Sequence, residues 1–129
     1  MAAFLSDEWF ALVRDVGSSL PPRTGVDASL QCVVAGAPAG KVQFVVRVVD
    51  GRIGEIASGK SESVDCTLQC SYAEACALVQ GAVDREVSYM RGDLKIDGNY
   101  VVYLLRLQPL FESAEFAAAG QSLRERTQF

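Results

Sequence analysis

The segment whose residue types and spacing come closest to a reactive site is residues 54–61, which read GEIASGKS. It matches the pattern G-x-x-x-x-G-K-[ST], in which backbone amides and the lysine hold the phosphates of a nucleotide. That chemistry requires a helix that begins at the lysine, so that its N-terminal amides face the phosphate. The residues after Lys60 instead have the composition of a turn followed by a strand. We therefore interpret the match as accidental and expect a hairpin turn here.

Four cysteines are the next candidates, for disulfides or for a metal site: Cys32, Cys66, Cys70 and Cys76. Cys66 and Cys70 lie four residues apart in a predicted strand, so their Cα atoms should be about 13 Å apart, roughly twice the distance that a disulfide spans. The same separation prevents them from sharing one metal ion. Cys32 and Cys76 lie among apolar residues. We interpret all four as small buried hydrophobic residues in a reducing, cytoplasmic compartment, and we predict no metal site.

General acid–base chemistry finds little support in the sequence. The chain contains no histidine, which removes the commonest general base near neutral pH and the commonest nitrogen ligand of metals. There is no G-x-S-x-G motif, and neither a Ser–His nor a Cys–His pair can form. The carboxylates of Glu74, Asp93 and Asp97 fall on predicted solvent-facing sides. We therefore predict that the protein is not an enzyme and has neither catalytic residues nor a cofactor.

The charge balance limits the partners. The chain carries 12 basic and 16 acidic residues, a net charge of −4. Nucleic acids and anionic membrane surfaces both need a clustered excess of Lys and Arg, so we expect no nucleic-acid partner and at most transient membrane contact. No stretch reaches the roughly 20 apolar residues of a membrane span. Asp7 and Glu8 interrupt the first residues, which argues against a signal peptide.

The 129 residues suit a single domain, residues 1–129. We expect an N-terminal helix over residues 6–16, a linker over 17–25, a core over 28–111 and a C-terminal helix over 112–120. The first helix should begin at the N-cap Ser6 and present one apolar stripe to the core. Its opposite face carries acids rather than the lysines of a membrane-surface helix.

Alternating apolar and polar residues predict four strands within residues 28–70 and a fifth at 93–97, with Asp50-Gly51 as a tight turn. Helical spacing predicts helices at residues 71–80 and 84–91 and another from Tyr100 onward. Each strand has one mainly apolar face, as in a sheet that is covered on one side only. The predicted fold class is therefore α+β, with two layers.

Residues 100–111, YVVYLLRLQPLF, form the most apolar of the predicted helices. Apolar side chains cover nearly its whole circumference, interrupted only by Arg106 and Gln108. A helix on a one-sided sheet should keep a polar outer face. The second apolar face must therefore contact other helices, a partner subunit or a lipid, and the residues alone leave these three alternatives open.

Residues 88–99, SYMRGDLKIDGN, resemble the signature of the sterol carrier protein type 2 family, in which an aromatic residue and a methionine precede Gly-x-Leu-x-Ile-x-Gly and an apolar helix. The upstream order is similar as well, with a Val/Phe-rich strand ending in Asp-Gly, a strand containing DCTL, and an acidic helix ending in glycine. The resemblance covers residues 28–110. It implies a five-stranded mixed sheet covered on one face by helices, with an apolar tunnel between the layers.

The resemblance also implies a non-catalytic intracellular carrier of fatty acids, fatty acyl-CoA or sterol-like lipids. Carried over to this chain, it implies a set of ligand-binding side chains: Phe44, Val46, Tyr89, Met90, Leu104, Leu107, Gln108 and Phe111. Gln108 would either hydrogen-bond a lipid head group or cap its helix.

The chain departs from the family pattern in two ways. It lacks the Ser-Lys-Leu-like ending that directs eukaryotic members to peroxisomes. It also has bulky residues at 100–103, where the family has small ones, which would narrow or fill the tunnel. With a filled cavity, the alternative is a protein-interaction or accessory module of a lipid-metabolising enzyme system, including a homodimer. The C-terminal helix would serve either as a lid on the tunnel or as part of the core.

Overall fold

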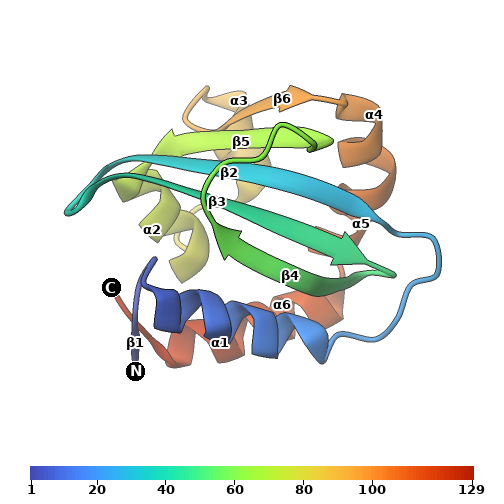
Figure 1. The fold of residues 1–129 in the computed structure, drawn as a ribbon, viewed down its shortest axis with the longest axis horizontal. Helices are drawn as coiled ribbons and strands as arrows, with labels where there is room; N and C mark the ends of the chain where they lie inside the picture. Colours follow the sequence, from blue (N-terminus) through green and yellow to red (C-terminus); the bar gives the residue numbers. More distant parts are fainter.

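The computed structural model describes all 129 residues and consists of a five-stranded sheet with helices on one face (Figure 1). The strand order is β4-β3-β2-β5-β6. Neighbouring strands are antiparallel except β2 and β5, which are parallel, so the predicted mixed sheet and α+β class are confirmed. The strands are β2 (Ala28–Ala37), β3 (Gly40–Val49), β4 (Arg52–Ser58), β5 (Cys66–Ser71) and β6 (Lys95–Gly98).

The helices form the second layer. In Figure 1, α2, α3 and α5 lie behind the sheet, α1 runs beside the edge strand β4, and α6 lies behind α1. None of them combines the length and the apolar character that a membrane span requires. The helices are α1 (Asp7–Ser18), α2 (Tyr72–Gln80), α3 (Arg85–Met90), α4 (Tyr100–Val102), the π-helix η1 (Tyr103–Leu107), α5 (Gln108–Phe111) and α6 (Ala114–Glu125).

Side-chain caps set several helix ends. Oγ of Ser6 accepts a hydrogen bond from the amide of Trp9, which confirms the predicted start of α1, although α1 ends at Ser18 rather than at residue 16. Oγ of Ser71 caps α2 in the same way, and Gly81 ends it with a left-handed φ of 75°, the conformation that glycine adopts most readily. Ser113 caps α6, so this helix begins at Ala114 rather than at residue 112. It continues to Glu125, past the predicted end at residue 120.

The tight turn predicted at Asp50-Gly51 is confirmed. Both residues have positive φ, 50° and 75°, as in a type I′ hairpin turn between β3 and β4. The hairpin turn expected at residues 54–61 is wrong. Residues 54–58 belong to β4, and the loop that follows crosses the open face of the sheet to β5, which is not a neighbour of β4 (Figure 1).

A buried polar side chain on the open face holds this loop in place. Nε2 of Gln31 donates to the carbonyl of Gly59 (3.1 Å), and its Oε1 accepts from the amide of Ser61 (2.8 Å). Gln31 is 3% exposed. Its side-chain amide supplies hydrogen-bond partners to backbone groups of the loop, which has no neighbouring strand to supply them. No helix begins at Lys60, which agrees with our interpretation of the phosphate-loop match as accidental.

The core has two parts on the helical side of the sheet. One lies under α1 and α2 and includes Trp9, Phe10 and Phe44. The other lies under η1 and α5 and includes Tyr103 and Leu107. All four cysteines are free thiols; Cys66 is buried and the other three are half-buried.

The two chain ends pair with each other, which we did not predict. β1 (Ala2–Ala3) and β7 (Thr127–Gln128) form a parallel two-stranded sheet, and α6 packs beside α1 (Figure 1).

Candidate functional site

An apolar pocket of about 280 Å³ lies between α3, β6 and the α4–η1 helix. This volume is just below the range for small-molecule sites, roughly 300–1,000 Å³. Most of its lining is aromatic or aliphatic, with three polar side chains at one side. The lining residues are Arg85, Glu86, Tyr89, Met90, Ile96, Tyr100, Tyr103, Leu104 and Gln108.

The segment that resembles the family signature builds one wall of this pocket. Ser88 is fully buried, and its Oγ donates to Oε1 of Glu74 on α2 (2.8 Å), which anchors α3. The carbonyl of Ser88 accepts from the amides of Asp93 and Leu94, so the chain folds back at once into β6. These bonds place Tyr89 of α3 and Ile96 of β6 on the same pocket.

A close approach of two backbones sets the direction of the next helix. Gly98 has a φ of 99°, and a Cβ at this position would lie 2.6 Å from the carbonyl oxygen of Asp65. That oxygen accepts a hydrogen bond of 2.7 Å from the amide of Asn99. Oδ1 of Asn99 then accepts from the amide of Val102 and caps α4. The glycine is therefore needed where β6 turns into the apolar helix.

Three tyrosines form a stacked row along the pocket. The rings of Tyr89 and Tyr100 lie 6.1 Å apart, and those of Tyr100 and Tyr103 lie 5.9 Å apart, with interplanar angles of 26° and 20°. A hydrogen bond with Tyr89 raises the pKa of Tyr100, and burial raises the pKa of Tyr103, although the nearby Arg85 opposes this. The phenols of Tyr100 and Tyr103 are therefore uncharged near neutral pH, and the row forms a flat apolar wall.

A π-helical turn aims the side chains of η1. The amide of Gln108 donates to the carbonyl of Tyr103, five residues back, instead of four. Pro109 follows directly and has no N–H to continue an α-helical pattern, so the wider turn accommodates it. As a result Leu107 is completely buried, whereas Leu104 is 41% exposed at the pocket. The proline inside an apolar run is the sequence signal for this irregularity.

The polar side of the pocket combines a cation and two hydrogen-bonding side chains. The guanidinium carbon of Arg85 lies 4.4 Å from the centroid of the Phe111 ring. Nε2 of Gln108 donates to Oε1 of Glu86 (2.8 Å) and of Glu112 (3.3 Å). The side-chain nitrogen of Gln108 is thus already engaged by carboxylates, while its oxygen has no partner in the protein.

The structure brings four of the eight predicted ligand-binding residues together in this pocket: Tyr89, Met90, Leu104 and Gln108. The other four lie in or against the packed core, where Phe44 belongs to the part under α1 and Leu107 to the part under η1. Val46 lies between the two parts, and Phe111 packs against Tyr103. Contact of any of the eight with a ligand stays a prediction, and the tunnel implied by the resemblance is not shown.

Five lining residues are not among the predicted ligand-binding residues: Arg85, Glu86, Ile96, Tyr100 and Tyr103. The sequence predicts Tyr100 and Tyr103 at the tunnel only as bulky residues that narrow or fill it. Ile96 and Tyr100 lie in or directly after the signature-like segment, so their position was a usable signal. Arg85 and Glu86 are the first residues of α3, where charged side chains are common. Only their contacts with Phe111 and Gln108, which are distant in the sequence, mark them as pocket residues.

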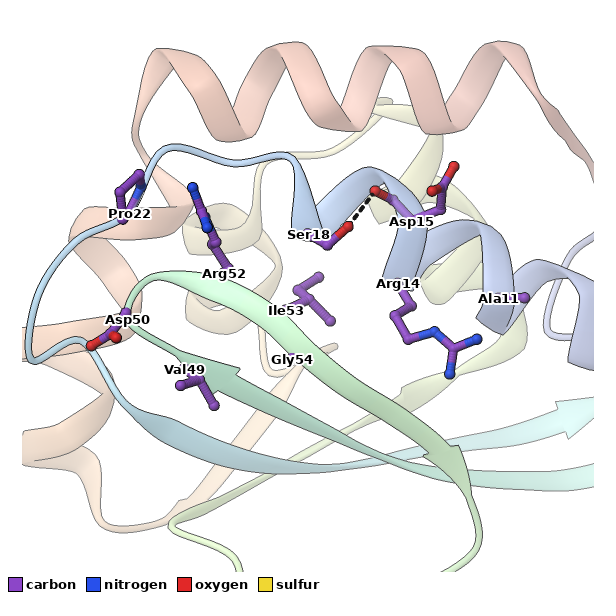
Figure 2. A pocket seen from close by; sticks show the side chains of 10 residues that line it. All are labelled: Ala11, Arg14, Asp15, Ser18, Pro22, Val49, Asp50, Arg52, Ile53 and Gly54. Atoms are coloured by element: carbon purple, nitrogen blue, oxygen red, sulfur yellow. Dashed lines mark hydrogen bonds between the residues drawn. The ribbon is translucent and has the colours of Figure 1, made fainter.

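A larger groove of about 610 Å³ lies between α1 and β4 (Figure 2). Its lining is mostly polar and includes the charged residues Arg14, Asp15, Asp50 and Arg52. Figure 2 shows Arg52 directed toward the segment after α1, where its Nε donates to the carbonyl of Leu20 (2.6 Å). Such a charged surface offers no apolar wall to an aliphatic chain, so the smaller pocket is the better candidate site for an apolar ligand.

The α6 helix does not line the smaller pocket. It packs beside α1, and Phe116 in its first turn contacts Phe111, with the two ring centroids 5.0 Å apart. A lid over this pocket would therefore require α6 to leave its present position.

Comparison with known proteins identifies the family. Residues 14–112 match the model of a family described as the SCP-2 sterol transfer family. Sterol carrier protein 2 of Gallus gallus is 31% identical over 81 residues, an alignment that covers 59% of this chain. The chain spans only 15% of the length of that relative.

Solved structures share the fold. A crystal structure of sterol carrier protein 2 matches with a TM-score of 0.70 at 18% identity, over 95% of this chain and 98% of the other. The solution structure of palmitated SCP2L2 from Aedes aegypti matches with a TM-score of 0.56 at 17% identity, over 92% of this chain and 94% of the other. The family match includes the signature-like segment and every residue of the pocket. This chain therefore belongs to the SCP-2 sterol transfer family, and the membership supports a role in lipid binding or transfer.

Proposed function

We propose that the protein is a non-catalytic carrier that holds a fatty acid, a fatty acyl-CoA or a sterol-like lipid in the pocket between α3, β6 and η1. The observation that carries the proposal is the lining of this pocket, where the tyrosine row faces Leu104 and Met90. The palmitated state of the Aedes aegypti structure supports a fatty acyl chain as ligand. The free cysteines support a cytoplasmic location.

The energetics suit reversible binding. Burial of a chain of about a dozen methylenes contributes roughly 10 kcal/mol, at about 0.8 kcal/mol for each methylene. Association costs at least about 4 kcal/mol of this, so about 6 kcal/mol remains and the expected dissociation constant is roughly tens of micromolar. A pocket of about 280 Å³ admits part of such a chain. The remainder would lie against exposed apolar side chains that line the pocket, chiefly Met90, which is 84% exposed.

Two neighbouring leucines provide a matched test. Leu104 lines the pocket, whereas Leu105 is 73% exposed and does not. Leu104→Trp should fill the pocket and weaken the binding of dodecanoate at least about tenfold, because the chain loses apolar contact area. Leu105→Trp adds the same side chain outside the pocket and should leave the affinity within twofold. Isothermal titration calorimetry measures both; equal affinities for the two variants would show that the pocket is not the binding site.

A second function is favoured by one further observation. Val101 and Leu105 are 62% and 73% exposed and lie four residues apart on the helical run from α4 into η1, which makes a small exposed apolar surface. This surface would suit an interaction module that binds a second protein or a second copy of the chain. Native mass spectrometry of protein purified from cells separates the two functions. A monomer with an adduct of lipid mass supports the carrier, and a dimer without an adduct supports the module.

A further inference from the structure

Arg85 stands out among the cations of the molecule because it lines the apolar pocket without a counter-ion. The structure contains five ion pairs, and these use Arg23, Arg47, Arg126 and, twice, Arg91. Arg85 takes part in none of them, although it is half-buried. A cation that is partly withdrawn from water is costly unless an anion or hydrogen-bond acceptors compensate it.

The neighbouring carboxylates are held by another partner. Oε1 of Glu86 and Oε1 of Glu112 both accept from Nε2 of Gln108, at 2.8 and 3.3 Å. Gln108 thereby engages both acidic groups. Without this amide, either carboxylate would be released and able to approach Arg85.

Aromatic faces hold the guanidinium in place. Its central carbon lies 4.4 Å from the ring centroid of Phe111 and 6.0 Å from that of Phe116. Rings attract a cation by their quadrupole but do not neutralise its charge. The guanidinium also donates a hydrogen bond to the hydroxyl of Tyr103. A guanidinium has five N–H donors, so others remain for a ligand. The group is therefore fixed in position beside the pocket, and no carboxylate forms an ion pair with it.

We infer that Arg85 binds the anionic head group of the lipid, a carboxylate or a phosphate, and makes the pocket selective for ionised amphiphiles over uncharged lipids. The planar guanidinium matches either oxyanion with two parallel hydrogen bonds. The chain of the ligand then runs from Arg85 past Tyr103 toward Tyr100 and Leu104, which all line the same pocket. This inference rests on the proposed carrier function.

Three ligands of equal chain length test it: dodecanoate, dodecyl phosphate and dodecan-1-ol, titrated below their micelle concentrations at pH 8. Arg85→Gln should weaken the binding of at least one of the two anions by about tenfold or more, because a charge-assisted hydrogen bond is lost, and should leave dodecanol within twofold. Arg85→Lys keeps the charge and should recover part of the loss. Arg14→Gln removes an equal charge on α1, outside this pocket, and should change nothing.

The outcomes separate this inference from the carrier function. A loss with dodecanoate alone assigns the site to carboxylates, and a loss with dodecyl phosphate alone assigns it to phosphates. Equal losses for all three ligands, or no loss for any, overturn the role of Arg85 while the carrier function stands. If the wild-type protein binds none of the three ligands, the carrier function itself fails. Near-UV circular dichroism of each variant verifies that it is folded.

Discussion

The indole Nε1 of Trp9 donates a hydrogen bond of 3.1 Å to Oγ1 of Thr127, 118 residues further along the chain. Both residues are buried, at 5% and 3% exposure, and the hydroxyl of Thr127 donates in turn to the carbonyl of Leu123 (2.6 Å). The contact joins α1 to β7, so the first and last elements of the chain stabilise each other.

Replacing this hydroxyl should destabilise the whole fold. Thr127→Val keeps the shape of the side chain but leaves the indole N–H buried without an acceptor, at a cost of about 1–3 kcal/mol in the free energy of unfolding. Thr127→Ser retains the hydroxyl and should lose less. Urea denaturation measures both values, and an equal loss for the two variants would show that the hydrogen bond contributes nothing.

The two signature glycines with positive φ should differ in their tolerance of a side chain. Gly92 (φ 80°) has no atom within 4 Å of an added Cβ, so Gly92→Ala should cost only the backbone strain, about 1–2 kcal/mol. Gly98→Ala adds a contact of 2.6 Å with the carbonyl of Asp65 and should cost clearly more. Thermal unfolding of the two variants measures the difference. Equal melting temperatures would contradict the close approach at Gly98.

Gln108 should affect head-group binding through its neighbours. Gln108→Leu releases Glu86 and Glu112, which are then able to approach Arg85 and to compete with an anionic ligand. We expect a severalfold weaker affinity for dodecanoate with no change for dodecan-1-ol. The triple variant Gln108→Leu with Glu86→Gln and Glu112→Gln removes both competitors and should restore the affinity. If the triple variant binds dodecanoate as weakly as the single one, Gln108 contacts the ligand itself.

Stability should fall in alkali because the fold withdraws the thiols of Cys32 and Cys70 from water. Burial raises the pKa of Cys32 to about 12 and that of Cys70 to about 11, from an ordinary value of 9.0. Above pH 9 the unfolded chain loses these protons while the folded chain retains them, so the free energy of unfolding decreases between pH 9 and 12. Each thiol contributes a slope of up to about 1.4 kcal/mol per pH unit.

Cys32→Ala tests this contribution, since alanine does not titrate. Urea denaturation under reducing conditions at pH 8, 9, 10 and 11 should give a shallower decline for the variant than for the wild-type protein. Parallel declines would mean that other groups cause the alkaline loss.

Local patterns were enough to predict much of the fold. The N-cap Ser6, the turn at Asp50-Gly51 and the helix end at Gly81 depend on neighbours within a few residues, and all three are confirmed. The alternation of the strands likewise predicted a sheet covered on one side.

The errors arose where distant residues decide the structure. The loop after β4 crosses the sheet to a strand that is not its neighbour, and Gln31, about 30 residues earlier, holds it there with hydrogen bonds. The pairing of β1 with β7 depends on residues at opposite ends of the chain. In the candidate site, Arg85 is notable only because Phe111 lies beneath it and Gln108 engages the nearby acids. No spacing rule within α3 would have revealed this.

The carbonyl of Asp65 explains why position 98 must be glycine, and this requirement concerns the junction of a strand and a helix, not the cargo. Ser88 and Leu94 of the same segment are likewise buried for structural reasons. A sequence motif built on these positions will therefore identify proteins with the same fold. It will not indicate which ligand each of them binds. Divergence in ligand preference among such relatives should be sought at positions 85, 100 and 104, which can vary without disturbing that junction.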